Sequence, residues 1–191
     1  MVEVMMDWKT DLVSLRAVRS SDFLEYFNNG EAIDTEAQRS GDRMKSPIGE
    51  DMVKKRVEDL SNQIPGEEDN FYIIEDIFLN PVGNINTHSC SRTDGTFEYG
   101  LGIRKKHRGL GYASDAVRLV LDFYFNELNY QKCNVKIYSY NTESINLHLK
   151  LGFVEEGRIR RSFFGKGAYH DIICMGLLRE EFERIILKSF E

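Results

Sequence analysis

A short glycine-rich turn holds the residues of this chain that are best suited to bind an anion. Backbone N–H groups at a helix start point toward an anion, and the helix dipole adds about half a positive charge there. Gly109 and Gly111 let the backbone approach closely and adopt positive φ angles, and the basic stretch 104–108 leads into them. The pattern predicts a phosphate-binding turn made of Arg108, Gly109, Leu110, Gly111, Tyr112 and Ala113.

Other phosphate-binding motifs fit this turn less well. A dinucleotide-binding Gly-x-Gly-x-x-Gly motif would need a third glycine where Ser114 stands, and an acid about 20 residues further on. A Walker-type loop would need Gly-Lys-Ser/Thr, which the turn lacks. A glycine turn that only redirects the chain remains the structural alternative.

The strand expected before the turn, Glu98-Tyr-Gly-Leu-Gly-Ile103, contains two glycines spaced two residues apart. Interior glycines weaken a strand and usually mark a bulge or the close approach of another backbone. Simple alternation puts Phe97, Tyr99, Leu101 and Ile103 on one face and Glu98, Gly100 and Gly102 on the other. An extended ligand with amide groups could therefore lie along this strand, and a purely structural bulge is the alternative.

A second polar motif follows the long helix, at the start of a shorter expected helix. Ser144 and His148 are one helical turn apart and share a face, and Asn141 stands at the cap. A histidine can donate a proton near neutral pH. Asn141 could instead be a simple N-cap, and His148 a partly buried helix residue.

Together these segments resemble the core of the GCN5-related N-acetyltransferases, the GNAT superfamily. Arg108, Gly111 and Ala113 match the Arg/Gln-x-x-Gly-x-Gly/Ala motif of that family. The run from Gly152 to Asp171 resembles the ribosomal-protein-alanine and spermidine/spermine N-acetyltransferase branch. The resemblance implies direct attack on acetyl-CoA by a primary amine: a polyamine, a protein N-terminus or an amino small molecule.

The resemblance also implies where acetyl-CoA binds. Its pyrophosphate would lie on the glycine turn, and its pantetheine arm would pair with the strand at Leu101, Gly102 and Ile103. One backbone N–H of this strand would polarise the thioester carbonyl, as an oxyanion hole does. In this family the residue corresponding to Asn141 commonly contacts the arm, and we expect Asn146 and Lys150 to contact the cofactor as well.

Proton transfer has three candidate residues. Many family members carry a tyrosine that protonates the departing thiolate at the position of His148, so His148 could replace it, and Ser144 is the alternative. Glu98 is the first candidate for the general base because it shares the glycine face of the strand, although it could be an exposed strand carboxylate.

The acceptor side of the chain carries three acids. Related enzymes bind the acceptor in the region of Glu31, Asp34 and Glu36, which could attract a cationic amine. An ordinary acidic surface loop is the alternative.

The periodicity of the chain predicts a single α/β (α+β) domain over 1–191, with a mixed, mostly antiparallel sheet flanked by helices. The order is β-α-α-β-β-β-α-β-α-β-β, followed by a C-terminal helix. The acceptor-side half spans about 12–65 and the acetyl-CoA-binding core about 96–178. Expected strands cover 12–18, 71–77, 82–89, 96–104, 133–140, 153–159 and 168–177; expected helices start at Asp22 and cover 50–63, 109–128 and 142–151.

Composition narrows the class of protein further. A net charge of −6 disfavours nucleic-acid binding and suits a cationic amine. The three cysteines and four histidines are scattered, so we expect no metal site and no disulfide framework. No apolar run predicts a membrane span, and cytoplasmic residence is the default expectation. A non-catalytic acetyl-CoA sensor, a nucleotide-binding module and a homodimer remain open.

Overall fold

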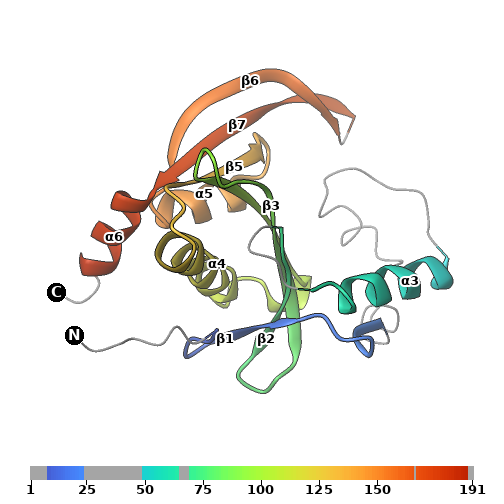
Figure 1. The fold of residues 1–191 in the computed structure, drawn as a ribbon. Helices are drawn as coiled ribbons and strands as arrows, with labels where there is room; N and C mark the ends of the chain where they lie inside the picture. The colour runs from blue at the N-terminus through green and yellow to red at the C-terminus, as the bar shows by residue number, and fades with distance from the viewer. Residues whose placement is uncertain (1–7, 24–48, 65–68, 166, 189–191) are drawn as a thin grey trace. The chain divides into compact units, whose positions relative to one another are not determined.

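The computed structural model describes residues 8–23, 49–64, 69–165 and 167–188 (Figure 1). Over these residues the order of elements agrees with the predicted α/β pattern. The short helix predicted after Asp22 falls mainly on 24–48, outside the described residues. The strands are β1 (Val13–Ala17), β2 (Phe71–Asp76), β3 (Pro81–Ser91), β4 (Thr96–Ile103), β5 (Lys132–Tyr138), β6 (Val154–Gly165) and β7 (Ala168–Leu178); the helices are α3 (Glu50–Ser61), α4 (Tyr112–Asp122), α5 (Thr142–Lys150) and α6 (Arg179–Lys188).

The strands form a seven-stranded sheet in the order β1-β2-β3-β4-β5-β7-β6. The β1–β2, β2–β3, β5–β7 and β6–β7 pairs are antiparallel, whereas β4 and β5 are parallel. A parallel pair needs a long crossover connection, and α4 lies in the segment that joins β4 to β5. The predicted mixed, mostly antiparallel sheet is therefore confirmed.

The chain divides into two compact units, each built from two stretches of sequence. The first unit comprises Met1–Asn86 and Gly100–Leu119, and the second comprises Thr87–Tyr99 and Val120–Glu191. Strands β3 and β4 and helix α4 each contribute residues to both units.

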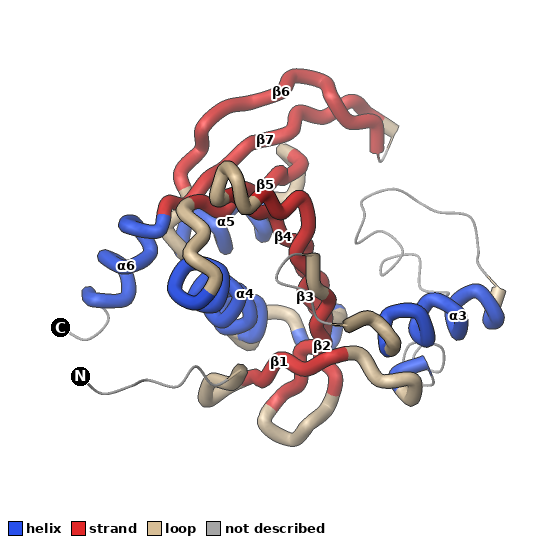
Figure 2. Tube along the Cα trace, viewed as in Figure 1, coloured by secondary structure: helices blue, strands red, loops and turns tan. Residues whose placement is uncertain are grey.

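In the first unit, β1 and β2 pair antiparallel, with Leu15 opposite Ile74 (Figure 2). Helix α3 carries its apolar residues on one face, as predicted, and ends two residues before the predicted end. Apolar burial of this kind stabilises the unit because it removes hydrocarbon from water. A buried cluster joins Val18, Val57 and Ile73, with the partly buried Phe23, Leu60 and Phe71 packed against it.

An ionic cluster fixes the chain just before residue 24. The Arg16 guanidinium donates to both carboxylate oxygens of Asp22, at 2.8 and 2.9 Å, and it also pairs with Glu75. Burial alone would raise the pKa of Asp22, but hydrogen bonds from Arg16 and from the Arg19 N–H lower it below its ordinary value. The cluster thus holds the end of β1 against β2.

In the second unit, β5, β7 and β6 pair antiparallel, and β6 and β7 form a long curved hairpin (Figure 1). Aromatic rings fill the core beside β4. The ring of Phe97 stacks on Tyr124 at a centroid distance of 4.3 Å and meets Phe125 and Tyr130 edge-on. These rings anchor the first half of β4, which carries Glu98 and Tyr99.

The helix predicted over 109–128 is shorter and less regular in the structure. Helix α4 begins at Tyr112, and a π-helical turn continues it over Phe123–Glu127. There the Leu128 N–H donates to the Phe123 carbonyl, five residues back. Tyr124 and Phe125, adjacent residues in this turn, are both fully buried. The predicted left-handed stop at Asn129 is confirmed by its φ of 59°.

The strand predicted over 153–159 continues in the structure to Gly165. Two bulges interrupt its pairing with β7, and Arg161 adopts a φ of 51° at the second. Pairing resumes because Phe163 is buried, with its ring 3.9 Å from that of Tyr138. The Asp171 carboxylate accepts the Arg161 N–H at 2.8 Å and holds the bulge in place. A bulge breaks the two-residue alternation, so the pattern alone predicted a strand end there.

Candidate active site

The predicted phosphate-binding turn has the backbone that its glycines suggested. Gly109 and Gly111 have φ angles of 79° and 89°, a region that favours glycine. No atom lies within 4 Å of a Cβ built at Gly109, so its positive φ alone requires glycine there. The Arg108 Nε donates to the Ile103 carbonyl at 3.1 Å and ties the turn to the end of β4.

The start of α4 is anchored by a side-chain hydrogen bond, and its first N–H groups have no partner within the helix. The first helical bond runs from the Asp115 N–H to the Gly111 carbonyl, so the N–H groups before Asp115 have no partner within the helix. The Asp115 carboxylate accepts the Thr10 hydroxyl at 2.7 Å. The turn is exposed at Gly111, which allows an anion to approach.

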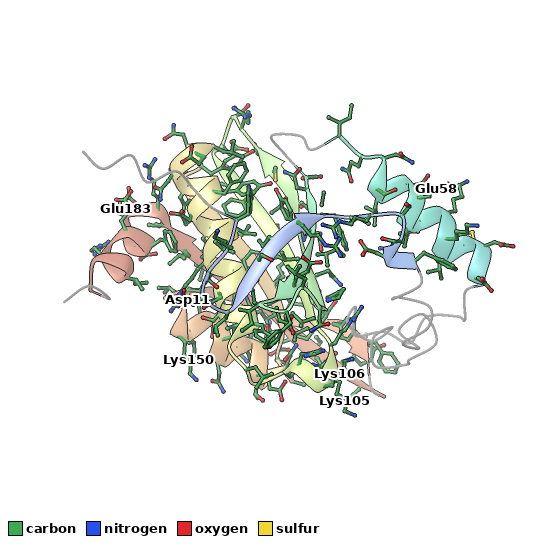
Figure 3. The ribbon with its side chains drawn as sticks, turned by 90° about the horizontal axis from the view of Figure 1, so that it is seen from below. Asp11, Glu58, Lys105, Lys106, Lys150 and Glu183 are labelled. Carbon is green, nitrogen blue, oxygen red and sulfur yellow. The ribbon has the colours of Figure 1, made fainter. Side chains whose placement is uncertain are left out.

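Cationic side chains flank the turn. Lys105 and Lys106 are exposed, and their side chains extend away from the ribbon in Figure 3. Burial and the positive charges of Lys106 and Arg104 lower the pKa of His107 below its ordinary value, so His107 is largely neutral near pH 7. The cationic charge beside the turn therefore comes from lysine and arginine.

Strand β4 pairs with β5 only at its beginning. The residues of β4 that pair with β5 run from Thr96 to Glu98, so Leu101–Ile103 lie beyond the last pair. The Arg104 N–H donates to the Val82 carbonyl of β3. Because backbone groups alternate between the two edges of a strand, Leu101 and Ile103 direct theirs to the other edge. An amide-bearing ligand could pair with the strand there.

A Cβ added to either glycine of β4 would meet an asparagine side chain. A Cβ at Gly100 would lie 2.9 Å from the Asn86 Oδ1, and one at Gly102 would lie 3.7 Å from the Asn84 amide. The close backbone approach predicted for this strand joins Gly102 to Gly83 of β3, where an added Cβ would lie 2.3 Å from the Gly102 carbonyl oxygen. The glycine face of β4 is therefore covered in part by two asparagine amides.

Glu98 has a charged partner that the sequence analysis did not identify. The Lys136 Nζ donates to the Glu98 Oε1 at 2.8 Å. The hydrogen bond to Glu98 raises the pKa of Lys136, so the ammonium stays charged. The Glu98 side chain is 19 % exposed, so it is only partly covered by the protein. Glu98 and Lys136 lie on the neighbouring strands β4 and β5. Because they are 38 residues apart in sequence, no local pattern predicts their contact.

The motif at the start of α5 forms a connected network. The Asn141 Oδ1 accepts the Ser144 N–H at 3.1 Å, so Asn141 is the N-cap of α5. His148 is 5 % exposed, and its Nδ1 lies 2.7 Å from the Ser144 carbonyl oxygen. Its Nε2 lies 2.8 Å from the Tyr99 hydroxyl. Burial lowers the pKa of His148 below its ordinary value. Strand alternation places Tyr99 on the apolar face of β4 and gives no sign of this hydroxyl contact.

The remaining predicted site residues are less constrained. Asn146 and Lys150 are exposed on α5, and Figure 3 labels Lys150. Glu31, Asp34 and Glu36 lie outside the described residues. Within the described ranges no cluster of three or more potential ligands could hold a metal ion. No described helix is long and apolar enough to cross a membrane.

Comparison with solved structures identifies the fold. A probable acetyltransferase superposes with a TM-score of 0.79 at 20% identity, covering 90% of this chain and 96% of that one. The spermidine N-acetyltransferase of Vibrio cholerae in complex with CoA and spermine superposes with a TM-score of 0.76 at 22% identity, covering 91% and 99%. At these identities the likeness establishes the fold alone.

Sequence comparison identifies the family. The model of the acetyltransferase (GNAT) domain matches residues 13–154. The SPbeta prophage-derived uncharacterized N-acetyltransferase YokL of Bacillus subtilis (strain 168) is 40% identical, over 92% of this chain and 95% of its own. The spermidine N(1)-acetyltransferase of Vibrio cholerae (serotype O1, El Tor Inaba N16961) is 28% identical, over 66% and 73%. The chain therefore belongs to the GNAT family.

Family membership defines the class of enzyme. The chain is an N-acetyltransferase that uses acetyl-CoA as the acetyl donor. The alternatives of a non-catalytic sensor and a nucleotide-binding module are accordingly set aside. The exposed N–H groups and positive-φ glycines at 108–113 suit a pyrophosphate, so the residues present fit this donor.

Proposed function

We propose that the enzyme acetylates a primary amine of a polyamine of the spermidine class. Two observations support this acceptor. Relatives named spermidine N(1)-acetyltransferases occur in Vibrio cholerae and, at 31% identity over 44% of this chain, in Escherichia coli K12. The net charge of −6 attracts a polycation over the Debye length, about 8 Å at physiological salt.

The proposed binding site for acetyl-CoA includes the end of β4 that does not pair with β5. Leu101 and Ile103 present backbone groups to the edge that lacks β5 pairing, and they would pair with the pantetheine arm. The turn from Arg108 to Ala113 would hold the pyrophosphate through helix N–H groups. Acetyl-CoA supplies the acetyl group as an activated thioester. A β4 N–H would donate to the thioester oxygen as negative charge develops there.

Glu98 is the proposed general base. A polyamine nitrogen is protonated at neutral pH and must lose a proton before it can attack. The Glu98 carboxylate would accept that proton, directly or through a water molecule. The ion pair with Lys136, at 2.8 Å, fixes the orientation of the carboxylate.

Ser144 is the proposed proton donor to the leaving thiolate. The serine would regain its proton from solvent, and solvent would take up the proton that Glu98 removes from the amine. Of the two candidates on α5, Ser144 is half-buried whereas His148 is buried with both ring nitrogens within hydrogen-bond distance of protein atoms. A ring in that setting cannot point a proton at a ligand without breaking a hydrogen bond. His148 is therefore proposed as a structural partner of Ser144 and not as the acid.

The test of this function is thiol release from acetyl-CoA with a panel of amines. The panel comprises spermidine, spermine, propylamine, a peptide with a free N-terminal alanine and an aminoglycoside. We expect spermidine or spermine to give the highest kcat/KM, by at least about tenfold, because a hydrogen-bonded or paired second amine contributes about 1.4 kcal/mol. Release with the peptide alone would contradict the polyamine acceptor and favour a protein N-terminus instead.

A further inference from the structure

A buried chain of hydrogen bonds connects β4 to α5 within the second unit. The Tyr99 hydroxyl lies 2.8 Å from the His148 Nε2, and the His148 Nδ1 lies 2.7 Å from the Ser144 carbonyl oxygen. The two rings stack at a centroid distance of 5.7 Å and an interplanar angle of 20°. Tyr99 is 7% exposed and His148 5%, so neither side chain exchanges these partners readily for water.

The partners of His148 determine which ring nitrogen carries the proton. A carbonyl oxygen only accepts, so the Nδ1 beside the Ser144 carbonyl must carry a hydrogen. In the neutral ring Nε2 is then an acceptor, and the Tyr99 hydroxyl donates to it. Burial lowers the pKa of His148, which favours the neutral ring. His148 is accordingly the Nδ1–H tautomer.

This tautomer has a consequence for the Ser144 hydroxyl. The Ser144 Oγ lies 3.4 Å from the same Nδ1. If the proton moved to Nε2, Nδ1 would become an acceptor and would attract the Ser144 hydroxyl proton. With the proton on Nδ1, that hydroxyl has no acceptor on the ring, and it can donate to a group outside the helix.

We propose that Tyr99 is a positioning residue: by donating to Nε2 it reinforces the Nδ1–H tautomer that the Ser144 carbonyl favours, and so leaves the Ser144 hydroxyl proton for the departing thiolate. This inference rests on the proposed role of Ser144 as proton donor. Many family members carry a tyrosine at the position of His148. The proposal gives a reason why this chain pairs a histidine there with Tyr99, which lies on the apolar face of β4.

Tyr99 itself is not the source of the proton. Burial, with a smaller contribution from the nearby Cys133, raises the pKa of Tyr99 well above its ordinary value. The phenol therefore stays protonated throughout the working pH range and serves as a fixed donor. Burial also raises the pKa of Cys133, so this thiol stays neutral and adds no charge to the chain of hydrogen bonds.

The experiment compares two tyrosine-to-phenylalanine variants. Tyr99→Phe removes the donor to His148, whereas Tyr124→Phe removes a hydroxyl that lies 2.6 Å from the Thr87 hydroxyl in the same unit. We expect Tyr99→Phe to lower kcat on the order of tenfold, the value of one buried hydrogen bond, with the KM for acetyl-CoA unchanged. Tyr124→Phe should keep the wild-type kcat although it removes the same chemical group.

Nitrogen-15 NMR of the histidine ring supplies a readout that a merely structural role would not change. We expect the wild-type His148 to carry its proton on Nδ1 and Tyr99→Phe to show a smaller population of that tautomer. An Nε2–H ring in the wild-type enzyme would overturn the proposal even if Tyr99→Phe did not fold. An equal kcat for Tyr99→Phe and Tyr124→Phe would overturn it as well.

Ser144→Ala separates this inference from the proposed function on which it rests. A wild-type kcat in Ser144→Ala would show that Ser144 is not the proton donor. The role proposed for Tyr99 would then be wrong as well. A large loss in Ser144→Ala together with no loss in Tyr99→Phe would overturn the role of Tyr99 alone.

Discussion

The chemistry at the residue scale depends on which groups hold protons and where those protons point. The Glu98 carboxylate is oriented by Lys136, whose Nζ donates to it at 2.8 Å. His148 is neutral and engaged on both ring nitrogens. Among Asn141, Ser144 and His148, only Ser144 carries a hydroxyl group, and this residue is half-buried. Base and acid are thus assigned to different elements, β4 and α5.

Glu98→Gln tests the base. Because the acceptor amine must lose a proton before attack, we expect kcat/KM to fall about 10²-fold at pH 7. The loss should shrink as the pH rises toward 10, because more of the amine is then already neutral and needs no base. A pH profile of kcat/KM for both proteins measures this. A loss of the same size at pH 7 and pH 9.5 would assign Glu98 to structure or binding and not to proton transfer.

His148→Gln tests the protonation state of the buried ring through stability. Burial lowers the pKa of His148 from 6.5, so the unfolded chain binds a proton at this residue at a higher pH than the folded chain does. The stability that neutral His148 contributes is complete above pH 6.5 and is lost as the pH falls toward the folded-state pKa. Between pH 7 and pH 5 the Tm of the wild type should therefore fall more than that of His148→Gln.

His107, whose pKa is also lowered, is present in both proteins, so its contribution cancels in this comparison. Parallel Tm curves for the two proteins would show that His148 titrates normally and is not held neutral.

At the scale of elements, the site depends on where regular structure stops. The pairing of β4 with β5 ends at Glu98, and α4 begins at Tyr112 after two positive-φ glycines. Both interruptions leave backbone groups without partners inside their own element. The donor binding proposed at these places would use backbone groups, so we expect side-chain substitution there to act mainly through conformation.

Gly109→Ala tests the turn, with Gly167→Ala as a matched control. Both glycines have a φ of 79° and no atom within 4 Å of an added Cβ, so each substitution adds the same backbone strain. That strain is about 1–2 kcal/mol for a left-handed residue. We expect similar losses of Tm, but only Gly109→Ala should raise the KM for acetyl-CoA, on the order of tenfold. An equal KM for acetyl-CoA in both variants would show that the turn does not take part in binding acetyl-CoA.

The sequence predicted the elements that follow regular periods and missed those that do not. Strand alternation and helix spacing located β1 to β5, α3 and α5 to within a few residues. The π turn at Phe123–Glu127 and the bulge at Arg161 break the period, so local pattern could not predict them. The two pairs that define the site chemistry, Tyr99 with His148 and Glu98 with Lys136, join separate elements, and no local signal reports such contacts.

At the scale of the whole molecule, the fold and the family define the reaction. The GNAT family model covers residues 13–154, and the sheet order agrees with the predicted fold class. The acceptor acids predicted at Glu31, Asp34 and Glu36 lie outside the described residues, so their role stays a prediction. The net charge of −6 adds a long-range attraction for polycations that does not depend on those three acids alone.

A competition assay tests the central claim most directly. The enzyme is given limiting acetyl-CoA and equal concentrations of spermidine and an alanine-starting peptide, and mass spectrometry measures both acetylated products. The account predicts that acetylspermidine exceeds acetylated peptide by at least about tenfold, the ratio that 1.4 kcal/mol of transition-state preference gives. A mixture dominated by acetylated peptide would contradict it.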